Sequence, residues 1–189
     1  MTSARRLHYD YAEYLHTLEA STIKLEYCDG VIYAMAAGTL VHAQLAAAVI
    51  VALSRTLPKT CRLSTSDLKV RVEATDLTTF PDVSVVCGQP ETSKLDANAI
   101  VNPSILVEVT SRSTEDYDRG DKLSHFKQLP TLRAVLFVSH RSRRITVVER
   151  MSGTWSERDV RGGERVTLAS DGIDFAVDDV YEGLTLDPA

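Results

Sequence analysis

The sequence lacks any apolar run long enough to cross a membrane. Its best candidate, QLAAAVIVAL, is much shorter than a membrane-spanning helix and has polar neighbours. Two arginines near the start of the chain are not followed by an apolar core, so we expect no signal peptide. These absences predict a cytoplasmic protein with no membrane partner.

Cysteine is also scarce. Cys28, Cys61 and Cys87 are an odd number and have no CxxC spacing, which disfavours both a zinc site and a redox motif. We therefore expect reduced, mostly buried thiols. A nucleophile motif such as G-x-S-x-G is absent too, so nothing supports a hydrolase that uses an activated serine on a substrate other than DNA.

Positive charge is not in excess, because the 189 residues carry a formal net charge of −5. That balance argues against an obvious nucleic-acid binder. The charge is unevenly spread, however. Residues 105–150 hold nine Lys and Arg against six Asp and Glu, whereas residues 171–189 hold six acidic residues and no Lys or Arg. The pattern fits either solvated surface charges or a basic central face with acidic flanks.

The composition is that of a globular protein, 44% hydrophobic, with no repeat and no linker. We expect one domain over residues 1–189, of the α/β or α+β class. The strand, helix and strand pattern of residues 105–139 predicts a parallel crossover.

Local signals place several elements along the chain. Apolar spacing predicts a helix over residues 9–20 and another over 39–57 that Pro58 ends. The dipeptide Asp29-Gly30 predicts a hairpin turn. A third helix is expected over residues 113–129, with Ser113 and Asp116 as a capping box, and a polar loop is expected over residues 89–103.

Two acidic residues stand where buried strands favour valine. Glu108 lies inside the apolar run ILVEV, and Asp82 opens the strand DVSVV directly after Pro81. A buried carboxylate is costly unless it meets a charge, a hydrogen bond or a metal. If the two strands are neighbours, the carboxylates repel each other, and a divalent cation removes that repulsion.

A lysine follows on the next predicted helix. Asp118, Lys122 and Phe126 have the i, i+4, i+8 spacing of one helix face, so Lys122 could point back over the strand that carries Glu108. A lysine beside a bound cation can stabilise charge on a phosphate or orient an attacking water.

These features together resemble the PD-(D/E)XK nuclease superfamily, in its branch of small bacterial restriction endonucleases of the Uma type. The resemblance covers nearly the whole chain. The matching segments are YAEYL, LEYCDGVIYAM, GTLVHAQLAAAVIVAL, FPDVSVV, PSILVEVTSRST, DRGDKLSHF and RAVLFVSHRSRRITVVER. It implies a restriction-endonuclease-like mixed β-sheet flanked by helices.

The resemblance also implies a function. The chain would be an Mg-dependent endonuclease that hydrolyses DNA and works as a homodimer. Asp82 and Glu108 would bind Mg²⁺ or Mn²⁺, with Lys122 aiding catalysis and Glu26 completing the acidic cluster. The residues expected to contact substrate are His42, Ser111 and Arg112.

One position departs from the motif. The superfamily has a lysine two residues after the second acid, where this chain has Thr110. Lys122 stands in the matching place for this branch, and Lys69 is a lesser alternative. The departure keeps open a second function, that of a nuclease fold that no longer cuts and serves as a DNA-binding or protein-interaction module.

Each candidate also has a structural interpretation. Asp82 could simply start a strand, and Glu108 could pair with Arg112 or Arg133. Lys122 could be a solvated partner of Asp118. His42 could cap or pack a helix, and the RSRR segment at residues 141–144 could be a hairpin tip in water or a phosphate contact.

Overall fold

The computed structural model describes residues 7–35, 37–112, 114–168 and 172–186. Among them, no helix is both long and apolar enough to span a membrane. The helices are α1 (Tyr11–Ala20), α2 (Leu40–Thr56), α3 (Glu115–Tyr117), α4 (Leu123–Phe126) and α5 (Val177–Tyr181). The strands are β1 (Leu25–Cys28), β2 (Val31–Ala34), β3 (Cys61–Thr65), β4 (Lys69–Val72), β5 (Leu77–Thr79), β6 (Val83–Cys87), β7 (Thr92–Ser93), β8 (Asp96–Ile100), β9 (Ile105–Val109), β10 (Ala134–Val138), β11 (Arg144–Met151), β12 (Thr154–Arg161), β13 (Arg165–Leu168) and β14 (Ile173–Ala176).

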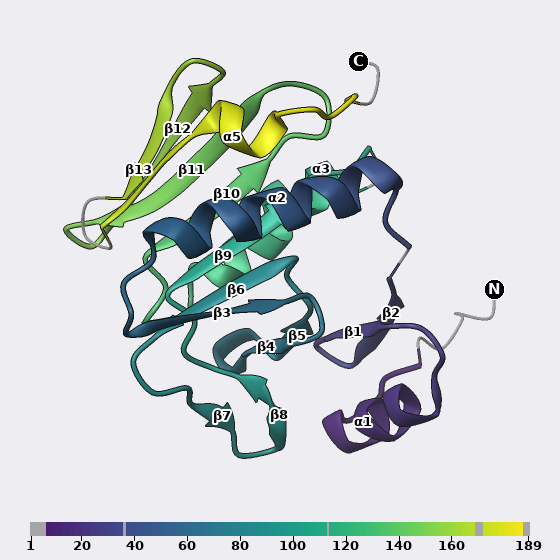
Figure 1. The fold of residues 1–189 in the computed structure, drawn as a ribbon. Helices are drawn as coiled ribbons and strands as arrows, with labels where there is room; N and C mark the ends of the chain where they lie inside the picture. The colour runs from purple at the N-terminus through teal and green to yellow at the C-terminus, as the bar shows by residue number, and fades with distance from the viewer. Residues whose placement is uncertain (1–6, 36, 113, 169–171, 187–189) are drawn as a thin grey trace.

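The strands form two six-stranded sheets and a two-stranded ribbon (Figure 1). The first sheet has the order β2-β1-β5-β4-β8-β7, and the second has the order β12-β11-β10-β9-β6-β3. Both are mixed, because β4 pairs parallel to β8 and β9 pairs parallel to β10 while the other pairs are antiparallel. The predicted mixed sheet flanked by helices is confirmed, although the strands divide between two sheets.

Local sequence signals explain how several of these elements begin and end. The carboxylate of Asp10 accepts a hydrogen bond of 2.8 Å from the amide of Glu13, and the carboxylate of Glu13 accepts one from the amide of Asp10. This capping box begins α1. Thr39 caps α2, and Pro58 follows soon after its last residue. Asp29 and Gly30 have φ angles of 44° and 79°, the left-handed turn that joins β1 to β2.

The helix expected over residues 113–129 is interrupted. It begins as α3, widens into a π-helical segment over Asp118–Lys122, and continues as α4. Such widened turns are frequent at functional sites. Ser113, the expected capping residue, lies outside the described residues.

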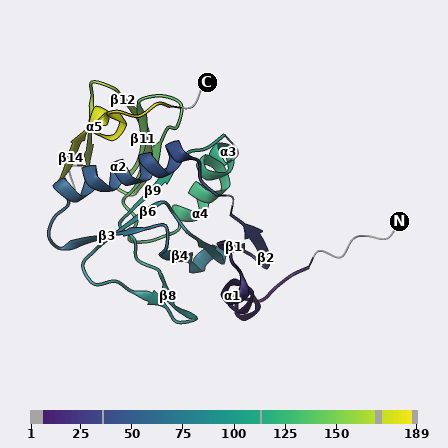
Figure 2. The ribbon, with the colours of Figure 1, turned by 45° about the vertical axis from the view of Figure 1, so that its right-hand side comes forward.

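Two apolar layers lie on opposite faces of the second sheet. On β9, Val107 and Val109 pack in the layer that contains α2, whereas Leu106 packs in the layer that contains α4. Side chains alternate along a strand, so Glu108 projects on the same face as Leu106. Figure 2 shows α2 and α4 on either side of the central strands. Glu108 therefore faces the segment that carries Lys122.

The polar stretch of residues 89–103 is not the loop that its composition predicts. It contains β7 and β8, an irregular antiparallel hairpin at the edge of the first sheet. Asp96 at the start of β8 is buried because Lys69 and the hydroxyl of Tyr11 contact its carboxylate. A strand of this kind is held by partners that are distant in sequence, so its own composition gives no signal.

The prediction of reduced thiols is wrong for two of the three cysteines. Cys61 on β3 lies directly opposite Cys87 on β6 in the antiparallel register, and the two form a disulfide. Cys28 is a free thiol. The odd number of cysteines concealed a pair that only the strand register brings together.

We expect this disulfide to stabilise the fold. It closes a loop with a sequence separation of 26 residues, for which chain entropy predicts a contribution of about 3 kcal/mol. Adding reductant should therefore lower the urea midpoint of the wild-type protein. A variant with both Cys61→Ser and Cys87→Ser should start from the lower midpoint and be insensitive to reductant. Equal midpoints for all samples would contradict the expectation.

Candidate active site

Asp82 and Glu108 converge at the end of one pair of strands. In the antiparallel register of β6 with β9, Val83 pairs with Val107 and Ser84 pairs with Leu106. The next step of this register places Asp82 opposite Glu108. The carboxylate of Asp82 also accepts a hydrogen bond of 2.7 Å from the amide of Val109. The two strands that carry these acids are therefore neighbours, as the repulsion argument from the sequence supposed.

Lys122 is buried beside these acids. Its Nζ atom lies 2.8 Å from Oε1 of Glu108, 3.4 Å from Oε1 of Glu26 and 3.7 Å from Oδ1 of Asp118. Its side chain is only 5% exposed. The alternative of a solvated partner for Asp118 is therefore wrong. The partner of Glu108 is this ammonium rather than Arg112.

Glu26 reaches the cluster from the other sheet. It lies on β1, and its Oε1 atom accepts hydrogen bonds from the hydroxyl of Thr79 and, at 3.3 Å, from the amide of Phe80. Asp118 completes the group from the π-helical segment. From the sequence, Asp118 is predicted only to lie on the same helix face as Lys122, and that i, i+4 spacing is the signal that the two residues share the site.

The cluster has more negative than positive charge. Burial raises the pKa of Glu108 well above its usual value, and the charges of Asp82 and Asp118 raise it further against the opposing effect of Lys122. Burial also raises the pKa of Asp118. The three surrounding carboxylates raise the pKa of Lys122 despite its burial, so this side chain stays charged.

His42 contacts Asp82. Its Nε2 atom lies 3.2 Å from Oδ2 of Asp82, and the hydrogen bond to Asp82 raises the pKa of the imidazole. Thr39 fixes the first turn of α2 through its bond to the amide of His42, which holds the histidine at this end of the helix. The prediction that His42 borders the site agrees with this geometry.

The other expected substrate contacts lie just beyond β9. The hydroxyl of Ser111 is 2.9 Å from that of Thr114, at the entry to α3. Arg112 is exposed and contacts none of the acids described above. Both residues follow Glu108 closely along the chain, and Arg112 makes no ion pair with the carboxylate cluster in the described part of the chain.

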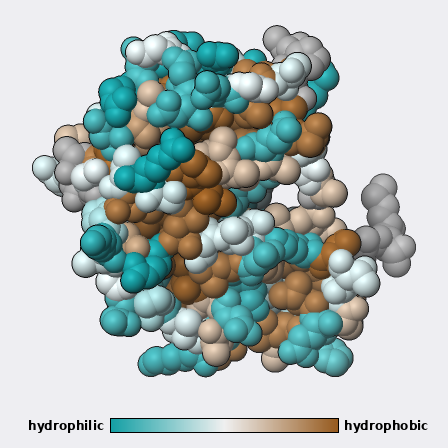
Figure 3. Space-filling model, in the orientation of Figure 1, coloured by the Kyte–Doolittle hydropathy of each residue, from teal (hydrophilic) through white to brown (hydrophobic). Residues whose placement is uncertain are grey.

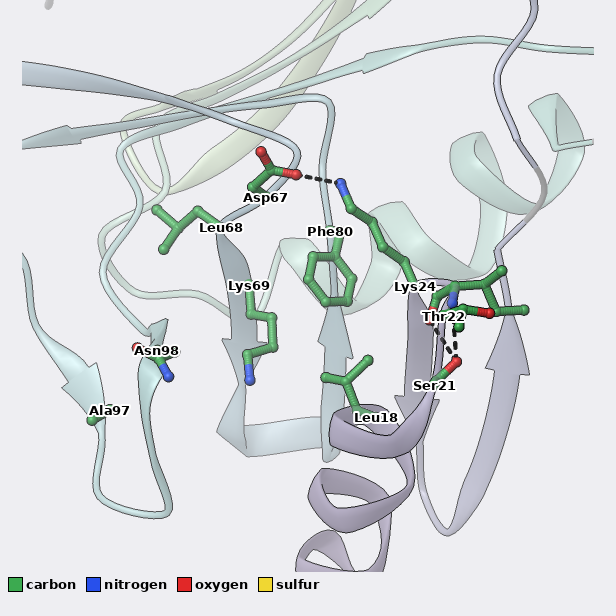
Figure 4. A pocket seen from close by; sticks show the side chains of 11 residues that line it. Leu18, Ser21, Thr22, Lys24, Asp67, Leu68, Lys69, Phe80, Ala97 and Asn98 are labelled. Carbon is green, nitrogen blue, oxygen red and sulfur yellow. Dashed lines mark hydrogen bonds and ion pairs between the residues drawn. The ribbon is translucent and has the colours of Figure 1, made fainter.

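A cleft lies beside the cluster rather than on it. It has a volume of about 640 Å³ and is lined by the end of α1, the segment between α1 and β1, and parts of β4 and β8 (Figure 4). Its two lysines are neutralised, since Lys24 lies 2.9 Å from Asp67 and Lys69 lies 2.5 Å from Asp96. Lys69 is thus ion-paired with Asp96, outside the carboxylate cluster, and Lys122 rather than Lys69 is the lysine of the candidate site. Phe80 lines the cleft and connects it to Glu26.

The residues present suit a hard divalent cation with few protein ligands. No group of three or more His, Cys, Asp or Glu side chains arranged for a metal is found within the described part of the chain. Mg²⁺, however, commonly takes one or two carboxylates and completes its shell with water and phosphate. Oε1 of Glu108 is buried and accepts no well-aligned hydrogen bond, although it is ion-paired with Lys122. A cation that bound at this oxygen would share it with the ammonium of Lys122 or displace that ammonium.

Known proteins support the fold and the family. The crystal structure of a protein described as a putative nuclease belonging to DUF820, from Anabaena variabilis ATCC 29413, superimposes with a TM-score of 0.73. The match covers 90% of this chain and 96% of that one at 14% sequence identity, so it shows a shared fold.

Two relatives come from Synechocystis sp. (strain ATCC 27184 / PCC 6803 / Kazusa), and both are described as uncharacterised. Protein slr1290 is 37% identical over 174 residues, which cover 91% of this chain and 90% of the relative. Protein sll1609 is 29% identical over 132 residues, which cover 67% and 72% respectively. Residues 11–178 match the Uma2 family, described as "Putative restriction endonuclease". This match spans most of the chain, including every member of the carboxylate cluster, and the protein belongs to the Uma2 family.

Proposed function

We propose that this protein is a metal-dependent endonuclease that hydrolyses phosphodiester bonds in DNA. The observation that carries the proposal is the convergence of Asp82 and Glu108 from neighbouring strands beside the buried ammonium of Lys122. A buried group with surplus negative charge favours the binding of a divalent cation. Family membership agrees with nuclease chemistry.

Asp82 and Glu108 are the residues that would hold Mg²⁺ or Mn²⁺. When bound, the cation supplies an activated water and neutralises charge on the scissile phosphate. Lys122 provides a fixed positive charge that stabilises the additional negative charge of the attacked phosphate. Hydrolysis adds water across one P–O bond and leaves a phosphate on one DNA end and a hydroxyl on the other.

The remaining residues position these groups. Glu26 and Asp118 hold the ammonium of Lys122 at 3.4 Å and 3.7 Å, which limits its motion. One oxygen of Asp82 contacts His42 and also accepts a hydrogen bond from the amide of Val109. The two contacts together fix the direction of this carboxylate. Preorganisation of this kind reduces the reorganisation needed during the reaction.

The proposal includes a homodimer. Cutting both strands of a duplex requires two sites, which a two-fold dimer supplies. Figure 3 shows apolar side chains gathered over α2. On this helix, Leu40 is 73% exposed and Val51 is 47% exposed, which makes its outer face a candidate contact between subunits.

The second candidate is a nuclease fold that binds DNA or protein without cutting. The observation that favours it is that the ammonium of Lys122 lies against Glu108, in the place where a cation would bind. The motif position two residues after Glu108 is also occupied by Thr110 rather than lysine. The two candidates differ in whether a divalent cation enables cleavage.

Cleavage of supercoiled plasmid DNA distinguishes them. We expect the wild-type protein to nick the plasmid with Mn²⁺ or Mg²⁺ and to be inactive with EDTA. Asp82→Asn should abolish nicking because it removes one cation ligand. Asp174→Asn is the matched control, since Asp174 is exposed and paired with Arg165 at 2.6 Å. Equal nicking by wild type and Asp82→Asn would indicate contamination, and no nicking with either metal would favour the second candidate.

A further inference from the structure

The arginines that follow β10 differ in their partners. Arg143 pairs with Asp178 at 3.1 Å, and Arg144 lies 3.7 Å from Glu115 and 3.6 Å from Asp159. Arg141 is exposed and has no acidic partner among the described residues. Among the arginines of the RSRR segment, Arg141 is therefore the one whose positive charge is not balanced by a described acidic residue.

The guanidinium of Arg141 is nevertheless held in place. Its Nε atom donates a hydrogen bond of 3.0 Å to Nε2 of His140, a residue that is only 3% exposed. Because Nε2 accepts this bond, the proton of the neutral ring is on Nδ1, which lies 3.0 Å from the hydroxyl of Thr110. Thr110 in turn can donate to the carbonyl of Val138 at 3.4 Å. The chain of bonds fixes Arg141 while leaving both Nη groups without a protein partner in the described structure.

A second uncompensated arginine, Arg112, follows the end of the neighbouring strand β9. Strands β9 and β10 are parallel with a constant offset of 29 residues, since Ile105 pairs with Ala134 and Val109 with Val138. The same offset relates Arg112 to Arg141, three positions beyond the paired residues. Arg112 is exposed and has no acidic partner in the described part of the chain. Both arginines thus follow the same ends of two neighbouring parallel strands, and β9 carries Glu108 near that end.

We infer that Arg112 and Arg141 form a clamp for the phosphate backbone of DNA, with His140 as the residue that positions Arg141. An arginine guanidinium matches phosphate geometry and keeps its charge at every working pH. Contacts to phosphates set the register of DNA on a protein without reading its sequence. The clamp rests on the proposed function, because it places the substrate strand at the edge of β9 and β10 beside the carboxylate cluster. It also explains how a chain with a net charge of −5 recruits DNA.

Binding measured without cleavage tests the clamp. The full chain is titrated in EDTA against a fluorescent DNA duplex at several salt concentrations, and anisotropy gives the affinity. We expect Arg112→Gln and Arg141→Gln each to weaken binding about 5-fold to 20-fold for any sequence. Each substitution should make the slope of log affinity against log salt shallower by about 0.9, and the double variant by about 1.8. Arg165→Gln is the control, because Arg165 is exposed but paired with Asp174.

The outcomes separate the clamp from the proposed chemistry. Arginine-dependent binding supports the clamp even if the wild type does not cut plasmid DNA, in which case the endonuclease proposal alone fails. Unchanged affinity and salt slope in both variants overturn the clamp, whether or not the wild type cuts. A wild-type protein that does not bind the duplex also overturns it.

The DNA affinities of single and double variants test whether His140 positions Arg141 or merely stabilises the fold. His140→Leu removes the acceptor for Arg141, so we expect it to weaken DNA binding and to add nothing to Arg141→Gln. His140→Gln keeps both an acceptor and a donor, and it should restore most of the affinity. Additive effects of His140→Leu and Arg141→Gln, at equal folded fraction by circular dichroism, would contradict the positioning role.

Discussion

Replacing Lys122 by methionine should lower the free energy of unfolding by about 3–5 kcal/mol near neutral pH, because it leaves buried carboxylates without their positive partner. The three acids around its ammonium are all buried, so water cannot compensate them. The same substitution should abolish DNA cleavage. Urea unfolding and plasmid nicking measure the two effects.

Lys69→Met is the matched control for this substitution. Lys69 is also buried, but its single partner Asp96 keeps hydrogen bonds from the hydroxyl of Tyr11 and the amide of Asn98. We expect a smaller loss of stability and no loss of cleavage. If Lys122→Met were as stable as the wild type, the ammonium would not be needed to balance the cluster.

Replacing Glu108 by glutamine should separate stability from function. The raised pKa of Glu108 means that ionising it in the folded protein is costly. In metal-free buffer the wild type should lose stability as pH rises from the ordinary glutamate pKa of about 4.3 through the raised folded value. Glutamine has the same shape and does not ionise, so the variant should lack this decline. Cleavage should fall by about 100-fold or more, because a cation ligand is lost.

Glu149→Gln provides the comparison for that variant. Glu149 lies on β11 of the same sheet and is buried, but it pairs with Arg158 at 2.9 Å and lies outside the carboxylate cluster. It should retain cleavage. A Glu108→Gln protein that cuts DNA at the wild-type rate would contradict the assignment of Glu108 as a ligand.

The elements that sequence predicted well are those that short-range chemistry determines. Asp29-Gly30 can adopt the left-handed turn that few other pairs allow, and Pro58 cannot continue a helix. The placement of Asp82 and Glu108 side by side also agrees with the sequence, because Asp82 opens one apolar strand and Glu108 lies inside another. Burying a carboxylate without a compensating charge is costly, so two acids in neighbouring apolar strands indicate a positively charged partner that both share.

The parts that sequence missed depend on contacts between distant segments. The disulfide requires the register of β3 with β6, which Cys61 and Cys87 do not reveal by spacing. The family resemblance implied that Glu26 completes the cluster, but residue spacing does not reveal its contact with Lys122, because only packing between the two sheets brings them together. The widened turn over Asp118–Lys122 departs from the regular helix that the spacing of this segment predicts.

Titration calorimetry with Mn²⁺ tests the central claim most directly. We predict that the wild-type protein binds one Mn²⁺ ion per chain, that Asp82→Ala and Glu108→Gln lose this binding while remaining folded by circular dichroism, and that Glu149→Gln binds as the wild type does. Absence of binding by the wild type, or undiminished binding by both site variants, would contradict the account of a cation held between the two strands.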